Sequence, residues 1–312
     1  MPKSQDAQIP TMVPFAFILG VIIWSTTPLG IVWSSESVHP TMAVLLRMLI
    51  ALTLGFVIIL CTRIRLPMNS QALKLYAFST IGMVGGMLLS YFAARYIGSG
   101  TISLIFGLAP IISGLLAQKI LGEPAFSKVR LLAFAVAFIG LGVVCFDRLG
   151  TGDNAWVGIG LILGAVSLFS LSAVLVKTVN VSIHPLASTV GTLSMSTPLF
   201  ALAWVVFDGT LPVETWQAKS LYAIIYLGII GSLVASVAYF YILQHLRAST
   251  VTLVTLITPA FAMMLGALLN GESITANLLI GAGLVLSGLS LYQFGEKCRW
   301  LSGKAKQPHL ES

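Results

Sequence analysis

The sequence predicts an all-α integral membrane protein with ten transmembrane helices, arranged as two inverted five-helix repeats. Its 312 residues are 57% hydrophobic and only 9% charged, whereas a soluble domain carries about 25% charged residues. Several apolar runs approach the roughly 20 residues that a helix needs to cross a bilayer. In addition, a motif around Pro110 recurs 149 residues later, around Pro259.

The apolar runs give the ten helices in order. They lie near residues 12–33, 40–60, 73–96, 100–120, 128–146, 155–176, 185–207, 219–243, 250–270 and 275–294. Lipid admits only helices or closed barrels, and these runs are too long for barrel strands of about ten residues. Glycines four residues apart, such as Gly82/Gly86 and Gly160/Gly164, suit close helix packing. The connections are short, so we expect no soluble domain between the helices.

The fourth helix of each predicted half ends in a shared pattern. The stretch "LAPIISGLLAQKILGEP" (108–124) aligns with "ITPAFAMMLGALLNGES" (257–273). At this shift the pairs Pro110/Pro259, Gly122/Gly271 and Glu123/Glu272 coincide. We therefore expect a first half at 1–150 and a second at 151–312, the latter ending in a basic cytoplasmic tail. Because five is odd, the second half enters the membrane from the opposite side, as in many secondary transporters.

The basic residues predict the orientation. With the N-terminus inside, thirteen of the 17 lysines and arginines fall on the cytoplasmic side. Only Arg95, Arg148 and Lys219 fall outside, and Arg47 lies within a span. By the positive-inside rule we expect both termini in the cytoplasm of a multi-pass cell-membrane protein, with the first run retained rather than cleaved as a signal peptide. The net charge of +7 is spread over loops and tail, so nucleic-acid binding is not expected.

Three further motifs carry a family resemblance. "YFAARYIGSGTISLIFGLAPIISGLLAQKILGEP", "ILGVIIWSTTPLG" and "LLRMLIAL" resemble the EamA type of the drug/metabolite transporter superfamily, over nearly the whole chain. The resemblance implies a transporter that usually exports amino acids or related small metabolites. It also implies a central cavity between the first, third, fourth, sixth, eighth and ninth helices. Two departures leave the substrate open: Thr192 stands at the counterpart of Arg47, and Ser25 replaces the common glycine after the tryptophan.

Proline near the start of a membrane helix predicts a bend. Pro110 and Pro259 lie where each fourth helix should be continuous, and each removes a backbone hydrogen bond. A bent or locally opened helix turns carbonyl groups toward a cavity and provides a place to flex. We expect both prolines to act as hinges in alternating access between the halves.

Arg47 is a basic side chain inside a predicted span and has two interpretations. A buried arginine can pair with an anionic or carboxylate group of a substrate. Alternatively, Arg47 is structural, since it lies seven residues past Pro40, about 10 Å along a helix. In that case its side chain reaches outward to water, nearby carbonyls or Glu36.

Aromatic and hydroxyl residues are the candidate cavity lining. They are Trp24, Ser25, Thr27, Ser90, Tyr91, Phe106, Ser167, Ser170, Tyr239, Thr252 and Thr255. The pairs Ser167/Ser170 and Thr252/Thr255 are three residues apart and so share a helix face. The alternative is that the hydroxyls bond back to their own helix, and that the aromatic rings mark the membrane interface.

The remaining chemistry points away from catalysis. Every carboxylate lies near a predicted helix end or in a loop, so a buried acid for proton or sodium coupling is not indicated. The histidines lie outside the spans, and the cysteines fit no metal or redox spacing. We expect no catalytic residues, no metal and no cofactor. The expected partners are a small-molecule substrate and the lipid bilayer, and a monomer is compatible with the sequence. A membrane scaffold or sensor, and an intramembrane enzyme, are the competing classes.

Overall fold

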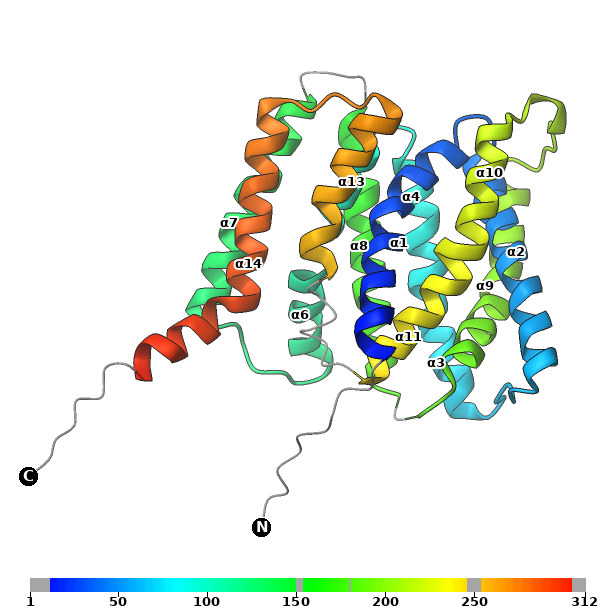
Figure 1. The fold of residues 1–312 in the computed structure, drawn as a ribbon, viewed down its shortest axis with the longest axis horizontal. Coiled ribbons are helices and arrows are strands. Elements are labelled where there is room, and N and C mark those ends of the chain that lie inside the picture. Colours follow the sequence, from blue (N-terminus) through cyan, green and yellow to red (C-terminus); the bar gives the residue numbers. More distant parts are fainter. Residues whose placement is uncertain (1–11, 150–153, 180, 246–253, 305–312) are drawn as a thin grey trace, which may run out of the picture.

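The computed structural model describes residues 12–149, 154–179, 181–245 and 254–304, in which all regular structure is helical (Figure 1). In chain order the elements are α1 (Met12–Ser34), α2 (Pro40–Thr62), α3 (Ser70–Thr80), the π-helical η1 (Ile81–Gly86), α4 (Met87–Ala93), α5 (Ser99–Phe106), α6 (Ala109–Ile120), α7 (Lys128–Leu149), α8 (Ala155–Lys177), α9 (Pro185–Phe207), the 3-10 turn η2 (Val213–Thr215), α10 (Ala218–Tyr226), the π-helical η3 (Leu227–Val234), α11 (Ala235–His245), α13 (Val254–Asn270) and α14 (Ala276–Lys304).

These elements form the ten predicted membrane helices. Three spans are composite: α3, η1 and α4 form one, α5 and α6 form another, and α10, η3 and α11 form the third. Within the described ranges, eight spans are long and apolar enough to cross a membrane. The shorter apolar helix in α13, together with α7, completes the ten. The ten-helix prediction is confirmed.

The packing relates the two halves as inverted repeats. α7 lies along α14, and α2 along α9, so equivalent helices of the two halves pair with each other. α1 packs against α10, α11 and α13, while α8 packs against η1, α4 and α6, which is the same relation with the halves exchanged. In Figure 1 the start of α1 and the end of α14 lie at the same lower face. We call this the terminal face and the other side the opposite face.

Local sequence explains where the second helix of each half begins. His39-Pro40 opens α2 and His184-Pro185 opens α9, with the proline in the first turn in both cases. Proline is favoured there because its fixed φ suits the helix and its missing N–H has no partner to lose.

The fourth helices end alike in the two halves. Gly122 and Gly271 adopt left-handed φ values of 67° and 62°, a conformation that favours glycine after a helix. The N–H groups of Glu123 and Glu272 then donate to carbonyls six residues earlier, at 3.3 and 3.1 Å. The shared glycine–glutamate pattern is therefore a shared helix ending.

The two prolines differ in their surroundings. Pro110 lies in the first turn of α6, after a break at residues 107–108, so the span is locally opened there rather than continuous. Pro259 instead lies inside α13. The locally opened helix that the sequence predicts is present at Pro110, because a helix that restarts there accommodates the missing N–H in its first turn.

Buried apolar side chains form two main groups. One lies among α5, α7, α8 and α14 and includes Ile102, Ile162 and Val285. The other lies around α2, α9 and η3 and includes Met48 and Leu193. This second group surrounds the buried arginine described next.

Candidate functional site

The third helix of each half contains a π-helical segment. With the 149-residue shift of the repeat, residues 81–85 of η1 fall on residues 230–234 of η3. Such segments are rare and frequently occur at functional sites, because they redirect backbone carbonyls and side chains within a helix. We therefore take the two segments and their partners as the centre of the candidate site.

Arg47 of α2 reaches η3 in the other half. Its side chain is only 1% exposed, and its Nε donates to the hydroxyl of Ser232 at 2.6 Å. Nη2 donates to the carbonyl of Gly231 at 2.9 Å, and Nη1 lies 3.5 Å from the hydroxyl of Tyr91 on α4. The guanidinium thus joins both halves in a buried setting.

The partners of Arg47 are all neutral. Glu36, a partner considered from the sequence, is instead 2.7 Å from Lys219. Among the described residues no carboxylate forms an ion pair with Arg47. A buried cation without a counter-ion is costly in a medium of low polarity, so this position is a candidate for binding an anionic group.

The aromatic candidates fall into separate contacts. The rings of Trp24 and Tyr239 meet edge to face, with centroids 6.2 Å apart, and join α1 to α11. Tyr91 is buried beside Arg47. Phe106 at the end of α5 lies 5.7 Å from the ring of Phe169 on α8.

Most hydroxyl candidates bond to their own helix, which is the alternative considered from the sequence. Ser25, Thr27, Ser90 and Ser167 each donate to a carbonyl four residues earlier, at 2.7 to 2.8 Å. Such bonds satisfy the hydroxyl within the helix. These four side chains therefore have their donors occupied in this conformation.

Ser167 and Ser170 do not share an environment, contrary to expectation. Ser167 is exposed, whereas Ser170 is buried and donates across to the carbonyl of Ala109 at 3.3 Å. Three residues turn a helix by about 300°, which leaves the two side chains about 60° apart around the helix axis. Here this offset is enough to place Ser167 outward and Ser170 against α6. Thr252 and the side chain of Thr255 lie outside the described residues.

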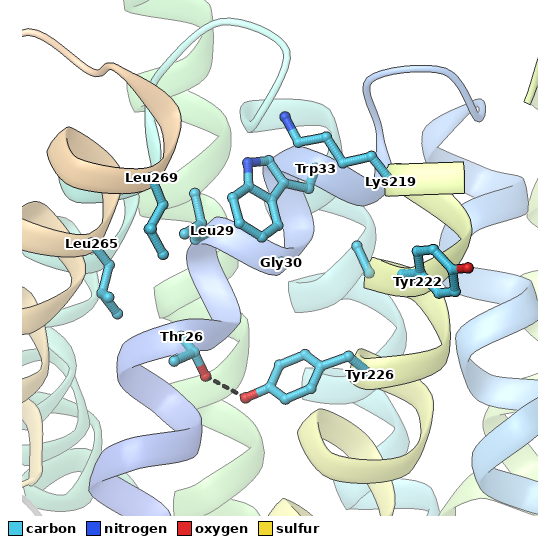
Figure 2. Close-up of a pocket in the computed structure, with 10 residues that line it drawn as sticks. Thr26, Leu29, Gly30, Trp33, Lys219, Tyr222, Tyr226, Leu265 and Leu269 are labelled. Carbon is cyan, nitrogen blue, oxygen red and sulfur yellow. Dashed lines mark hydrogen bonds between the residues drawn. The ribbon is translucent and has the colours of Figure 1, made fainter. Parts of the chain in front are cut away.

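A half-open groove of about 680 Å³ lies between the halves. It is formed by α1, α10 and α13, and is lined by Thr26, Leu29, Gly30, Trp33, Lys219, Tyr222, Ala223, Tyr226, Leu265 and Leu269 (Figure 2). At one end the hydroxyls of Thr26 and Tyr226 are 2.5 Å apart. At the other, near the opposite face, the Lys219 ammonium lies 5.0 Å from the Trp33 ring. Ser25 and Thr27 were predicted from the sequence and Thr26 was not, because nothing in the sequence indicates which of three adjacent hydroxyls faces a groove.

The fold and this arrangement define a ten-helix inverted-repeat membrane protein. The EamA-like transporter family matches the chain twice, at residues 11–146 and 156–293. The chain belongs to this family of membrane transporters. In the part of the chain that the structure describes, no group of three or more His, Cys, Asp or Glu residues is placed to hold a metal ion.

Individual relatives are distant but span nearly the whole chain. The uncharacterized transporter YoaV of Bacillus subtilis (strain 168) is 22% identical, over 89% of this chain and 96% of its own length. An uncharacterized transporter of Archaeoglobus fulgidus is 26% identical, over 87% of this chain and 95% of its own. The uncharacterized inner membrane transporter YedA of Escherichia coli (strain K12) is 22% identical over 88% of each. A crystal structure matches 91% of this chain and 98% of its own chain with a TM-score of 0.63 at 16% identity, which shows a shared fold.

Proposed function

We propose that this transporter exports amino acids or related small metabolites that carry a carboxylate, by alternating access between its two halves. The observation that carries the proposal is Arg47, a buried cation bonded only to neutral acceptors at the junction of α2, η3 and α4. A guanidinium has five N–H donors in a planar fork. That fork matches a carboxylate, which it binds bidentately and more strongly than it binds neutral groups.

Alternating access is supported by the way the halves meet. Inverted repeats place a substrate site near the membrane midplane at their interface and expose it to each side in turn. Arg47 lies at such an interface, since it comes from the first half while Ser232 and Gly231 come from the second. A substrate carboxylate there competes with the η3 carbonyl and hydroxyl for the same donors, which links binding to the position of the eighth helix.

The direct test is flux across proteoliposomes. We expect some amino acids or related metabolites in a panel to cross, and the same compounds to lose most of their flux when the carboxylate is replaced by an amide. Equal flux of acid and amide contradicts a carboxylate site while leaving transport intact. If no solute crosses although the protein is verified as folded, a membrane scaffold or sensor is favoured instead.

The orientation is a separate proposal, with both termini cytoplasmic and the opposite face external. It rests on the excess of Lys and Arg at the terminal face. In a cysteine-free background, Met68→Cys and Glu214→Cys place single thiols at exposed positions in connections on the two faces. We expect an impermeant thiol reagent on intact cells to label the Glu214→Cys variant and not the Met68→Cys variant. The reverse pattern contradicts the orientation, and labelling of both contradicts the inverted arrangement.

A further inference from the structure

Glu272 joins the two halves at the opposite face. It follows α13 in the second half, and its carboxylate lies at the start of α5 in the first half. Its Oε1 accepts the Ser99 N–H at 2.9 Å and the Ser99 hydroxyl at 2.7 Å. Its Oε2 accepts the Gly100 N–H at 3.2 Å. Both carboxylate oxygens are thus bonded to the first turn of a helix in the other half.

This contact is favourable for two reasons. The first N–H groups of a helix have no partner within the helix, and a carboxylate there also opposes the positive end of the helix dipole. Hydrogen bonds that involve an ionised group are stronger than neutral ones. Glu272 therefore acts as a cap for α5, supplied by the other half of the protein.

Glycines allow the carboxylate to approach the helix so closely. A Cβ added at Gly98 lies 2.6 Å from Oε2 of Glu272. A Cβ at Gly266 lies 2.6 Å from the Ser99 hydroxyl and 2.7 Å from the same Oε2. Any side chain at either position has to displace the carboxylate or the helix.

The contact continues to α1. The Asn270 amide donates to Oε1 of Glu272 at 3.2 Å, and its own oxygen accepts the Trp33 indole N–H at 2.8 Å. One connected set of hydrogen bonds therefore links α1, the end of α13 and the start of α5, all at the opposite face. We call Glu272, Asn270, Ser99 and Trp33 the clasp.

The counterpart of Glu272 is not engaged in the same way. Glu123 follows the same left-handed glycine and has the same backbone hydrogen bond, at the terminal face. Its side chain is exposed, and it makes no side-chain hydrogen bond or ion pair with the described residues. The equivalent glutamates at the two faces thus have different surroundings.

We infer that Glu272 is a positioning residue of the transport cycle, whose carboxylate holds the opposite face closed. This inference rests on the proposed transport by alternating access. When the opposite face opens, the end of α13 separates from α5, and the carboxylate exchanges its bonds with Ser99 and Gly100 for water. The clasp therefore sets the balance between the closed and open states of that face.

The test uses a thiol two residues past Ser99 of the clasp. Thr101 is buried in the first turn of α5, so Thr101→Cys in a cysteine-free background reports separation at this point. Glu272→Gln keeps the shape but removes the charge and turns an NH2 group toward backbone donors. We expect an impermeant reagent applied at the opposite face to label the Glu272→Gln variant about tenfold faster, a change of about 1.4 kcal/mol in the opening equilibrium.

Glu214→Gln is the matched control, because Glu214 is an exposed glutamate in η2 at the same face. It should leave the labelling rate unchanged. Gly266→Ala is a second route to the same result, since it displaces the carboxylate without altering its charge. Faster labelling with a loss of stability no larger than about 1.4 kcal/mol supports a shift between folded states rather than general loosening.

The outcomes separate the clasp from transport itself. Equal labelling of the Glu272→Gln and Glu214→Gln variants in folded protein overturns the clasp, even if wild-type protein transports solutes. Faster labelling together with a loss of stability well above about 1.4 kcal/mol in the Glu272→Gln variant reduces Glu272 to a structural cap and overturns the inference as well. If wild-type protein moves no solute, the proposed function fails, whatever the labelling shows.

Discussion

The two π-helical segments occupy equivalent places in the two halves but have different partners. η1 is packed tightly on α8, and just before η1 the Ser172 hydroxyl of α8 donates to the carbonyl of Phe78 near the end of α3, at 2.8 Å. A Cβ added at Gly82 lies 2.7 Å from Ser172 Cβ. η3 instead faces α2, and its Ser232 and Gly231 bind the buried guanidinium of Arg47.

This difference shows that the two halves have the same arrangement of helices but different polar side chains at equivalent positions. Thr192, the counterpart of Arg47, donates to the carbonyl of Ser188 in its own helix at 2.8 Å and leaves η1 without a cation. The first half therefore supplies a charged side chain, Arg47, to η3 of the second half. The second half instead packs Ser172 of α8 against Gly82 in η1 of the first half. A polar site between the halves is expected on the η3 side, where the charge is.

The largest difference in stability between equivalent substitutions is expected at the equivalent glycines Gly82 and Gly231. In Gly82→Ala the new methyl group meets Ser172, and also the Phe169 backbone at 3.3 Å, so helices must move apart. We expect Gly82→Ala to lower the free energy of unfolding by an amount near the upper end of the roughly 1–3 kcal/mol typical of overpacking. In Gly231→Ala the nearest atoms are Leu227 at 3.0 Å and the Arg47 side chain at 3.4 Å, which are flexible ends. Melting temperatures in detergent check this, and a larger loss for Gly231→Ala contradicts the comparison.

A smaller difference in stability is expected between Ser232 of η3, which binds Arg47, and Ser172 of α8, which binds the end of α3 beside η1. Ser232→Ala removes an acceptor from a charged donor, which should cost about 1.5 kcal/mol or more. Ser172→Ala removes a neutral bond and should cost about 1 kcal/mol. Ser232→Ala should also lower flux, because the guanidinium loses its alignment, whereas Ser172→Ala should affect stability alone. Melting temperatures and flux measured on both variants test this difference. A loss of flux in Ser172→Ala alone contradicts it and indicates that η1, not η3, is the functional segment.

The smallest effects are expected at the prolines. Pro259→Ala adds a helix former inside α13 and permits one more helical hydrogen bond. Pro110→Ala changes the first turn of α6, where no helical bond is missing, so its effect on stability should be close to zero. Neighbouring groups already satisfy much of the backbone around prolines in membrane helices, so the main effect of Pro259→Ala should be slower flux. Wild-type flux in both variants makes the prolines packing features rather than hinges.

Much of the fold follows from the sequence. Continuous apolar runs predict the ten helices, and the Pro110/Pro259, Gly122/Gly271 and Glu123/Glu272 pairs predict the repeat. The π-helical segments were not predictable, since one extra residue per turn leaves no trace in a helix that is apolar on all sides. The break before Pro110, in contrast, was indicated by the proline itself.

The candidate site was less predictable because its contacts are distant in sequence. Arg47 was identified from its charge alone, but Ser232 lies 185 residues away, and no local pattern connects them. Glu272 was recognised only as part of the repeat. The signal that points to its role is the Gly98-Ser99-Gly100 stretch, a helix start whose N-cap glycine has no side chain to cap it.

The most direct test of a functional arginine bound to η3 is proteoliposome flux of a transported acid by wild-type protein and two Arg47 variants. Arg47→Lys keeps the charge but loses the planar fork of donors, and Arg47→Gln loses the charge as well. We expect both variants to reach the membrane folded, with flux lowered in Arg47→Lys and nearly absent in Arg47→Gln. Normal flux in folded Arg47→Gln protein contradicts the account and leaves Arg47 as a structural tether.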